Sequence, residues 1–199
     1  MPPVYEASMQ LLEKYGRKRI SFSEWRSHTK ASAGESFLSL GISVEEAQID
    51  ADFATLYREI VVREVNPIRP VMYSDVPFVL RTLADKKLPV AIISSHPRDC
   101  LEQELKEYSI RHFFDEISGD PFPKTARLQR MCERRNLSPS DVFFVEDTSY
   151  GLQSGHAAGV QCFGVTTGYR TRERLLAAGC AIAVLDSLRE LLEYVDSEI

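Results

Sequence analysis

Apolar residues follow one spacing before Pro70 and another after it. Between residue 4 and about residue 66 they recur at helical intervals, as in the run from Val4 to Tyr15, which Gly16 ends. This part of the chain therefore predicts helices only. After Pro70, short apolar runs of the length of buried strands alternate with helical segments. That alternation indicates a parallel sheet whose two faces are covered by helices.

The second part of the chain predicts an ordered series of strands and helices. The predicted fold class is α/β, with a helical domain over residues 1–70 and an open α/β domain over residues 71–199. The predicted strands are Pro89–Ile93, Phe113–Ile117, Val142–Val145, Gln161–Val165 and a segment near Ala181–Val184, and the predicted helices are Val76–Lys86, Asp99–Tyr108, Lys124–Arg135, Leu152–Ala158 and Leu188–Val195.

Composition and charge narrow the classes of function. The 199 residues are 44% hydrophobic and carry a net charge of −5, whereas nucleic-acid-binding proteins normally present a basic face. We therefore expect no nucleic-acid partner. No apolar stretch approaches the ~20 residues that cross a bilayer, and the first residues lack the pattern of a signal peptide. We expect no membrane partner, a cytoplasmic location, and four reduced cysteines, since these are scattered along the sequence.

Polar residues follow two of the predicted strands, and a lysine lies between them in the sequence. Ser94–His96 follows the first strand, Glu146–Thr148 follows the third, and Lys124 begins a helix. Ligands bind at the carboxyl ends of the strands in open α/β sheets. A hydroxyl and a lysine there suit phosphoryl oxygens, and carboxylates suit Mg²⁺. Taken singly, each also has an ordinary structural explanation, such as a helix cap or a solvated lysine.

The acidic segment carries a resemblance to a known family. Val142–Gly151, continued by His156–Val160, resembles the acidic motif of haloacid-dehalogenase-type phosphatases, and is most similar to the branch of phosphoglycolate phosphatase and β-phosphoglucomutase. Thr166–Tyr169 fits the same branch, and the resemblance covers nearly the whole chain. It implies a Rossmann-like parallel core with an N-terminal helical cap. It also implies a Mg²⁺-dependent phosphatase that acts on a small phosphorylated metabolite through an aspartyl-phosphate.

The resemblance also implies roles for individual residues. Ser94 and Lys124 match the catalytic hydroxyl and lysine, although Thr125 follows the lysine where the family usually has proline. Asp147 matches the ligand of Mg²⁺, with Glu146 assisting. Expected contacts to the substrate come from Ser95 and His96 beside the first strand, and from Arg26 and Lys30 in the cap. The alternative for Arg26 and Lys30 is a solvated polar helix end.

One part of the family pattern is not found in this sequence. The family's first core strand ends in Asp-x-Asp, of which the first Asp attacks phosphorus and the second acts as acid and base. The only Asp-x-Asp here is Asp50-Ala51-Asp52, and the residues before it are helical and charged, so we expect a solvated helix face. The resemblance therefore implies that the first core strand is absent, and that its place is between Val90–Ile93 and Val142–Val145.

Several alternatives stay open at this point. A non-catalytic protein of the same family would keep phosphate or metal binding without the nucleophile, and a mutase of the β-phosphoglucomutase type would share the acidic motif. A 2-haloacid dehalogenase is disfavoured, because it needs no magnesium and lacks the Glu146-Asp147 pair. The oligomeric state is open as well, although sheet edges exposed by an absent strand would favour association with another chain.

Overall fold

The computed structural model describes residues 2–30, 33–62, 68–119 and 123–198. Close contacts divide the chain into two compact units, residues 1–71 and 72–199, and each is described by itself. No helix among the described residues is long and apolar enough to cross a membrane.

The first unit is helical, as the apolar spacing predicts. Its core is formed by side chains that are almost completely buried, among them Met9, Trp25, Phe37 and Tyr57. Tyr5 and Trp25 meet edge to face, with ring centroids 5.5 Å apart. The described helices of this unit are α1 (Pro2–Lys14), α2 (Phe22–His28), α3 (Ala33–Leu38) and α4 (Glu46–Val62).

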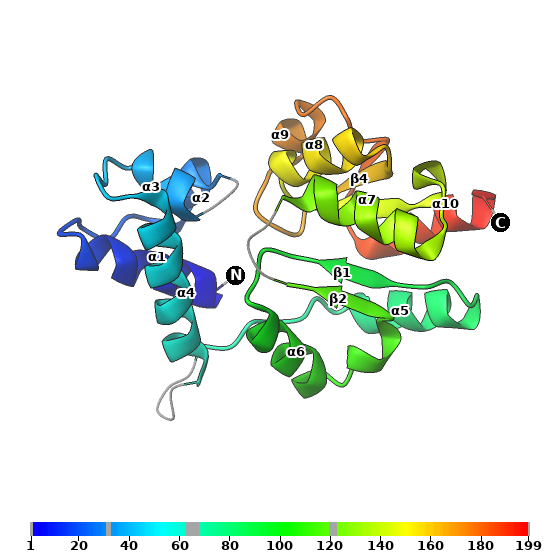
Figure 1. The fold of residues 1–199 in the computed structure, drawn as a ribbon, viewed down its shortest axis with the longest axis horizontal. Helices are drawn as coiled ribbons and strands as arrows, with labels where there is room; N and C mark the ends of the chain where they lie inside the picture. Colours follow the sequence, from blue (N-terminus) through cyan, green and yellow to red (C-terminus); the bar gives the residue numbers. More distant parts are fainter. Residues whose placement is uncertain (1, 31–32, 63–67, 120–122, 199) are drawn as a thin grey trace. The chain divides into compact units, whose positions relative to one another are not determined.

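The second unit contains parallel strands in two separate sheets (Figure 1). One sheet has the order β1-β2 and the other has the order β3-β4-β5, and every pairing is parallel. This arrangement confirms the α/β class. The strands are β1 (Ala91–Ile93), β2 (Glu116–Ser118), β3 (Phe143–Glu146), β4 (Gln161–Val165) and β5 (Ala183–Leu185).

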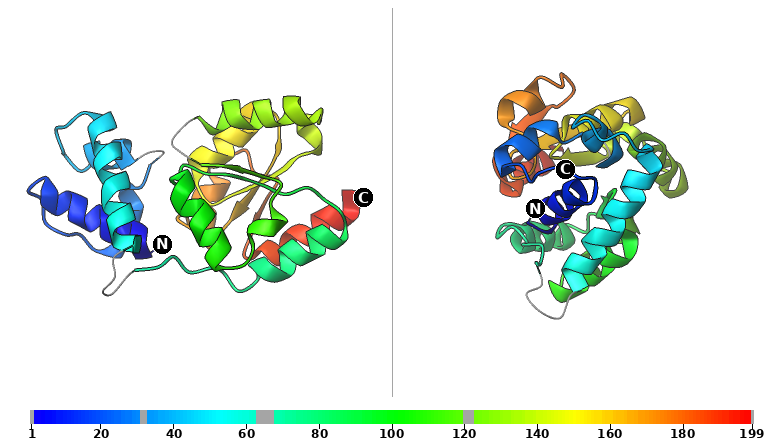
Figure 2. Two further views of the ribbon diagram at one scale, coloured as in Figure 1. Left: turned by 60° about the horizontal axis from the view of Figure 1, so that its bottom comes forward. Right: turned by 90° about the vertical axis from the view of Figure 1, so that its left-hand side faces the viewer.

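Helices cover both faces of these sheets (Figure 2). On one face, Leu128 and Met131 of α7 and Leu152 of α8 pack with Phe144 of β3. On the other, Leu191 and Val195 of α10 pack with Phe163 of β4. The strands are therefore apolar on both sides, which explains their continuous apolar runs. The helices of this unit are α5 (Val76–Asp85), α6 (Arg98–Glu107), α7 (Lys124–Arg135), α8 (Ser149–Ala158), α9 (Arg172–Leu176) and α10 (Leu191–Glu198), with 3₁₀ turns η1 (Arg111–Phe113), η2 (Pro139–Asp141) and η3 (Leu188–Glu190).

One predicted strand is misplaced. The apolar run Phe113–Ile117 predicts a strand, but its first residue ends the 3₁₀ turn η1, and the strand β2 begins only at Glu116. Phe113 and Phe114 still pack against the cluster that contains Ile117. The run therefore indicated burial correctly, but burial alone does not distinguish a strand from a turn that covers a core.

Helix α7 aligns the two sheets. At its first turn, Lys124 pairs with Glu146 at the end of β3, and Arg127 donates from Nη1 to the carbonyl oxygen of Ser94, 3.2 Å away, just after β1. The carboxyl ends of β1 and β3 therefore both lie at the N-terminal end of α7. It follows that the two sheets run in the same direction and present their carboxyl ends on one side of the unit.

Candidate functional site

The acidic segment is fixed at the junction of β3 and α8. Thr148 is the N-cap of α8, and its hydroxyl oxygen accepts a hydrogen bond of 3.0 Å from the backbone N–H of Gly151. The same hydroxyl donates a hydrogen bond of 3.0 Å to Oε1 of Glu146. The same Oε1 accepts from the backbone N–H of Asp147 at 3.1 Å. These hydrogen bonds therefore stabilise a sharp turn between β3 and α8 and fix the Glu146 carboxylate against it.

Two glycines make room for the carboxylates. A Cβ at Gly151 would lie 2.1 Å from Cδ of Glu146, and a Cβ at Gly168 would lie 1.9 Å from Oδ2 of Asp147. Both distances are far inside van der Waals contact, so a side chain at either position would displace the carboxylate. Glycine at these two positions is therefore a requirement of the site.

Lys124 and Glu146 form a buried ion pair. Nζ of Lys124 contacts Oε2 of Glu146, and the two side chains are only 15% and 6% exposed. Burial by itself raises the pKa of Glu146. The charge of Lys124, with hydrogen bonds from Asp147, Lys124 and Thr148, outweighs burial and holds this pKa below its usual range. Glu146 therefore remains ionised and fixes the position of the lysine.

Asp147 has the opposite electrostatic character. Its Oδ2 accepts a hydrogen bond of 2.9 Å from the backbone N–H of Tyr169, which follows Gly168 in the loop after β4. Burial, followed by repulsion from Glu146, raises the pKa of Asp147 to about 7. The two carboxylates thus lie near a single lysine, so their combined negative charge is larger than the positive charge that balances it. This charge balance fits a cation beside Asp147.

Ser94 lies at the matching end of β1. Its backbone N–H donates to Ser118 of β2 at 2.9 Å, and its Oγ accepts from the backbone N–H of His96 at 3.0 Å. Because Oγ accepts that bond, its own proton is left for another acceptor. Ser95 is exposed. Nε2 of His96 lies 3.0 Å from Oε1 of Glu104 on α6, so the imidazole is held by that helix.

The two predicted cap residues lie in the first unit. The Arg26 guanidinium is 5.9 Å from the centroid of the Phe22 ring on the same helix. Lys30 is exposed, and its backbone N–H donates to Oγ of Ser36 at 2.8 Å. Their role toward a substrate stays a prediction, because the two units are described separately.

Asp50 and Asp52 lie in helix α4, as expected, and not at the end of a strand. They are less solvated than the sequence suggested. Oδ1 of Asp50 accepts from the backbone N–H of Gly34 at 2.8 Å, while Oδ2 of Asp52 accepts from the hydroxyl of Tyr15 at 2.7 Å and pairs with Lys14. Both carboxylates therefore join α4 to neighbouring parts of the first unit, which explains their presence without chemistry.

Sequence reasoning missed the backbone donor of Tyr169 and the position of Arg127. The position of Arg127 could have been predicted, because a residue three positions after Lys124 lies on the same side of the helix. The contact between Tyr169 and Asp147 had no such signal, since it joins loops 22 residues apart. Within the described residues, no group of three or more His, Cys, Asp or Glu side chains is close enough to hold a metal.

Comparison with known proteins agrees with this geometry. The sequence pattern of the haloacid dehalogenase-like hydrolases matches residues 2–165. Phosphoglycolate phosphatase of Pasteurella multocida is 31% identical over 50% of this chain and 46% of its own length. The corresponding enzyme of Pseudomonas putida is 33% identical over 61% of this chain and 46% of its own length. The chain thus spans about half the length of these curated relatives.

A solved structure shows the same fold. The crystal structure of a predicted phosphatase from Clostridium acetobutylicum superposes with a TM-score of 0.84 at 19% identity, covering 98% of this chain and 91% of the other. The sequence pattern, the relatives and this fold all agree, and the chain belongs to the haloacid dehalogenase-like hydrolase family.

Proposed function

We propose that this chain forms the phosphate- and magnesium-binding part of a phosphatase that acts on a small phosphorylated metabolite. The observation that carries the proposal is the buried cluster of Lys124, Glu146 and Asp147 at the carboxyl end of β3. Burying two carboxylates beside a single lysine is costly for a structural site, because one charge is left incompletely paired. The binding of a cation and an anion at this site would account for the buried, incompletely paired charge.

Asp147 is the proposed ligand of Mg²⁺. Its oxygens are of the hard type that Mg²⁺ prefers, and the cation would relieve the repulsion from Glu146. A bound Mg²⁺ would offset negative charge on the phosphoryl group. Glu146 would assist indirectly, because its two oxygens already accept hydrogen bonds from Lys124, Thr148 and the backbone of Asp147.

Ser94 and Lys124 are the proposed contacts to the phosphoryl oxygens. The hydroxyl of Ser94 is oriented by the N–H of His96, and Arg127 holds the carbonyl of Ser94 from the first turns of α7. Lys124 brings a positive charge whose position is set by Glu146. Donors fixed in advance stabilise charge that develops during phosphoryl transfer, because they need not reorganise as it forms.

The chemical step follows from the family resemblance. An aspartate attacks phosphorus, the P–O bond to the alcohol breaks, and a second aspartate gives a proton to the leaving oxygen. Water then hydrolyses the aspartyl-phosphate while the second aspartate takes a proton from it, which releases inorganic phosphate and regenerates both aspartates. No strand in the described residues ends in such a pair, and the only Asp-x-Asp lies in α4. We therefore expect the 199-residue chain by itself to have no measurable turnover.

Substrate selection is the proposed role of the helical unit and of two residues after β1. Arg26 and Lys30 would serve as cap contacts, with Ser95 and His96 beside the reacting phosphate. The relatives named phosphoglycolate phosphatase support a small anionic phosphate ester as the substrate. A cytoplasmic enzyme without a nucleic-acid or membrane partner belongs to the same proposal.

A non-catalytic phosphate- or metal-binding protein is the second candidate. It is favoured by one observation, the position of the only Asp-x-Asp in a helix where both carboxylates have structural partners. Inorganic phosphate binding without any turnover after the strand is supplied would favour this candidate.

The test compares two proteins. One is the 199-residue chain. The other is the same chain preceded by an apolar strand of about six residues that ends in Asp-x-Asp-x-Thr. Phosphate release from a panel of small phosphomonoesters is measured with and without Mg²⁺. We expect release only from the extended protein and only with Mg²⁺, and Lys124→Ala should lower it by about 100-fold or more. Equal turnover by both proteins would contradict the proposal.

A further inference from the structure

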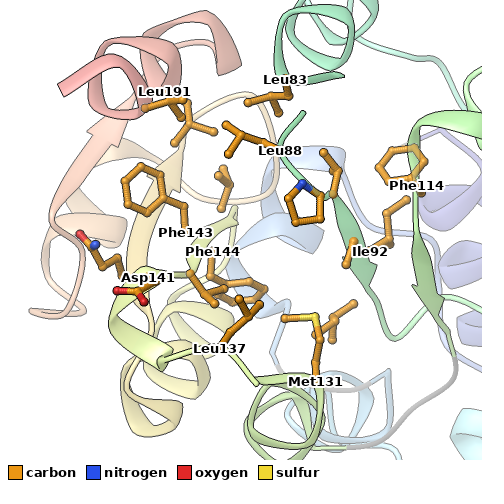
Figure 3. A pocket seen from close by; sticks show the side chains of 18 of the residues that line it. Leu83, Leu88, Ile92, Phe114, Met131, Leu137, Asp141, Phe143, Phe144 and Leu191 are labelled. Carbon is orange, nitrogen blue, oxygen red and sulfur yellow. The ribbon is translucent and has the colours of Figure 1, made fainter. Parts of the chain in front are cut away.

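Helix α7 borders two cavities of opposite character. The larger one lies between the two sheets, has a volume of about 690 Å³ and is lined by apolar side chains such as Leu83, Ile92 and Met131 (Figure 3). We call it the apolar slot. The smaller one lies between α7 and the sheet of β1 and β2, and its volume is about 260 Å³. We call it the basic pocket, and its lining residues are Ile93, Glu116, Ser118, Arg127, Arg130 and Arg134.

Three arginines of α7 line the basic pocket. Arg127, Arg130 and Arg134 follow one another at intervals of three and four positions, so a single side of the helix carries all of them. The neighbouring side of the helix carries Leu128 and Met131, which line the apolar slot. Helix α7 therefore presents an apolar side to the core and a cationic side to the basic pocket.

The strand β2 contributes the opposite wall of the basic pocket. Side chains alternate between the two faces of a strand, so Glu116 and Ser118 share one face and Ile117 lies on the other. Ile117 packs into an apolar cluster with Leu80 and Leu105. A strand of a parallel sheet with helices on both sides is normally apolar on both faces. The polar face of β2 departs from this pattern, and it is the face that lines the basic pocket.

Positive charge in the lining of the basic pocket exceeds negative charge. Among the described residues that line it, Glu116 is the only carboxylate, and it pairs with Arg134. Arg130 donates from Nε to the carbonyl oxygen of Ala126 in its own helix, at 3.2 Å, and no carboxylate in the described part of the chain pairs with it. The hydroxyl of Ser118 has no hydrogen-bond partner in that part of the chain either. The basic pocket therefore offers a cation and a hydroxyl that remain able to bind a ligand.

The size and chemistry of the basic pocket define the class of ligand. Guanidinium groups form paired, charge-assisted hydrogen bonds with the oxygens of phosphates and carboxylates, and a serine hydroxyl can donate one more. An anion with two or more negative charges would balance the excess of positive charge. The volume of about 260 Å³ is below the range of about 300–1,000 Å³ that is typical of sites for drug-sized ligands. The basic pocket therefore suits a small anion better than a nucleotide.

The basic pocket is separate from the cluster of Lys124, Glu146 and Asp147. That cluster lies at the carboxyl end of β3, and none of its three residues lines the basic pocket. From Arg127 to Arg134 the basic pocket follows α7 for about two turns, or roughly 10 Å, away from the N-terminal end of that helix. A ligand in the basic pocket would therefore lie beside the proposed phosphate site and would not occupy it.

We propose that the basic pocket binds a small oxyanion that carries at least two negative charges. Arg130, Arg134 and the hydroxyl of Ser118 contact the anion, and Arg127 adds positive charge to the wall of the pocket. The proposal concerns anion binding alone and does not rest on the phosphatase function.

The test is an NMR titration of the whole chain, without Mg²⁺ and at low ionic strength. Inorganic phosphate and citrate are the two probes, and they distinguish a phosphate group from a polycarboxylate as the preferred ligand. Signals of Ser118 and Arg130 report on the basic pocket, and those of Ser94 and Asp147 report on the proposed phosphate site. We expect saturable shifts at Ser118 and Arg130 with at least one probe, and weaker binding as sodium chloride is added.

Arg134→Gln and Arg135→Gln are a matched pair of variants. Each removes one positive charge from α7 and one contact to Glu116, whose Oε2 lies 3.4 Å from Nε of Arg135. Only Arg134 lines the basic pocket, because Arg135 lines the apolar slot. Arg134→Gln should weaken binding of the probe by about ten-fold. Arg135→Gln should change it by no more than about two-fold, because it removes no contact to the anion.

Glu116→Gln should have the opposite effect. It removes the negative charge from the basic pocket and releases Arg134, so the probe should bind at least about three-fold more tightly. Loss of structure would not tighten binding, and this comparison holds even if an arginine variant fails to fold. Equal affinities of Arg134→Gln and Arg135→Gln, or weaker binding by Glu116→Gln, would overturn the proposal.

The location of the shifts separates this inference from the proposed function. Shifts confined to Ser94 and Asp147, or no shifts with either probe, would overturn the basic pocket as an anion site. Neither result would contradict the phosphatase proposal, whose test is turnover. Shifts at Ser118 and Arg130 that follow the expected order of the variants would support the inference even if the extended protein has no turnover.

Discussion

At the scale of single residues, Glu146 and Asp147 are adjacent in sequence but differ in charge state. The charge of Lys124 and the hydrogen bonds around it keep the pKa of Glu146 low in spite of burial, whereas Asp147 keeps a raised pKa of about 7. One lysine thus distinguishes the two carboxylates: it keeps Glu146 ionised in a buried ion pair, and Asp147 is the carboxylate that we propose binds the cation. This division of roles follows from the contacts of β3 and α7 and is not visible in the sequence Glu-Asp.

The raised pKa of Asp147 predicts a pH dependence of stability. In the unfolded chain this carboxyl has an ordinary pKa of about 3.9. Between that value and about 7 the folded chain holds a proton that the unfolded chain does not. The contribution of Asp147 to the free energy of unfolding therefore falls as pH rises through this window and is constant above it. Asp147→Asn should remove this dependence and raise the melting temperature at about pH 8.

The measurement is a set of thermal melts without Mg²⁺ between about pH 4 and pH 8. Asp141→Asn is the control, since Asp141 is exposed and ends the turn η2, which precedes β3. The difference between each variant and the parent chain isolates the single carboxyl. A difference for Asp147→Asn that does not change with pH would show that Asp147 has an ordinary pKa in the folded chain.

At the scale of elements, the helix α7 and the strand β4 begin and end where the sequence predicts. Their apolar patterns are long or uniform enough to identify them. The strand β2 was misplaced, because its apolar residues also cover the core from a 3₁₀ turn. The positions of Ser94 after β1, Lys124 at the start of α7 and Asp147 after β3 could be predicted from the sequence, and their roles stay predictions. The contact of the backbone N–H of Tyr169 could not be predicted, because contacts between loops depend on tertiary packing.

The close approach of α8 to β3 gives a prediction at this scale. Alanine normally stabilises a helix relative to glycine, by up to about 1 kcal/mol. Gly151→Ala should instead destabilise the chain by about 1–3 kcal/mol, because its Cβ would collide with the Glu146 carboxylate. Chemical denaturation measures the change, and Gln153→Ala on the exposed side of α8 should be nearly neutral. A stabilising Gly151→Ala would mean that Glu146 can move aside at little cost.

At the scale of the whole molecule, the second unit is two half-sheets around an apolar slot. The family resemblance implies an absent strand between Val90–Ile93 and Val142–Val145, and in the described part of the chain β1 and β3 do not pair with each other. The sequence does not show whether the remaining strands close together or stay apart. The helices α5, α7 and α10 keep the slot open at about 690 Å³ in place of a collapsed core.

An apolar strand joined ahead of residue 1 should therefore stabilise the whole molecule. It would satisfy backbone groups on both edges and bury apolar surface, and each kcal/mol raises the melting temperature of a chain of this size by about 2–4 °C. We expect an increase of roughly 10 °C. A joined segment of equal length in which polar residues alternate with apolar ones is the control. Equal melting temperatures for the two extended chains would show that the slot does not accept a strand.

The most direct test of the account is the metal dependence of turnover in the protein extended by a strand that ends in Asp-x-Asp-x-Thr. Phosphate release is measured against Mg²⁺ concentration for the extended parent, for Asp147→Asn and for Asp141→Asn. We expect Mg²⁺-dependent release by the parent and by Asp141→Asn, and a loss of about 100-fold or more in Asp147→Asn. Mg²⁺-dependent release that survives Asp147→Asn would contradict the assignment of the site.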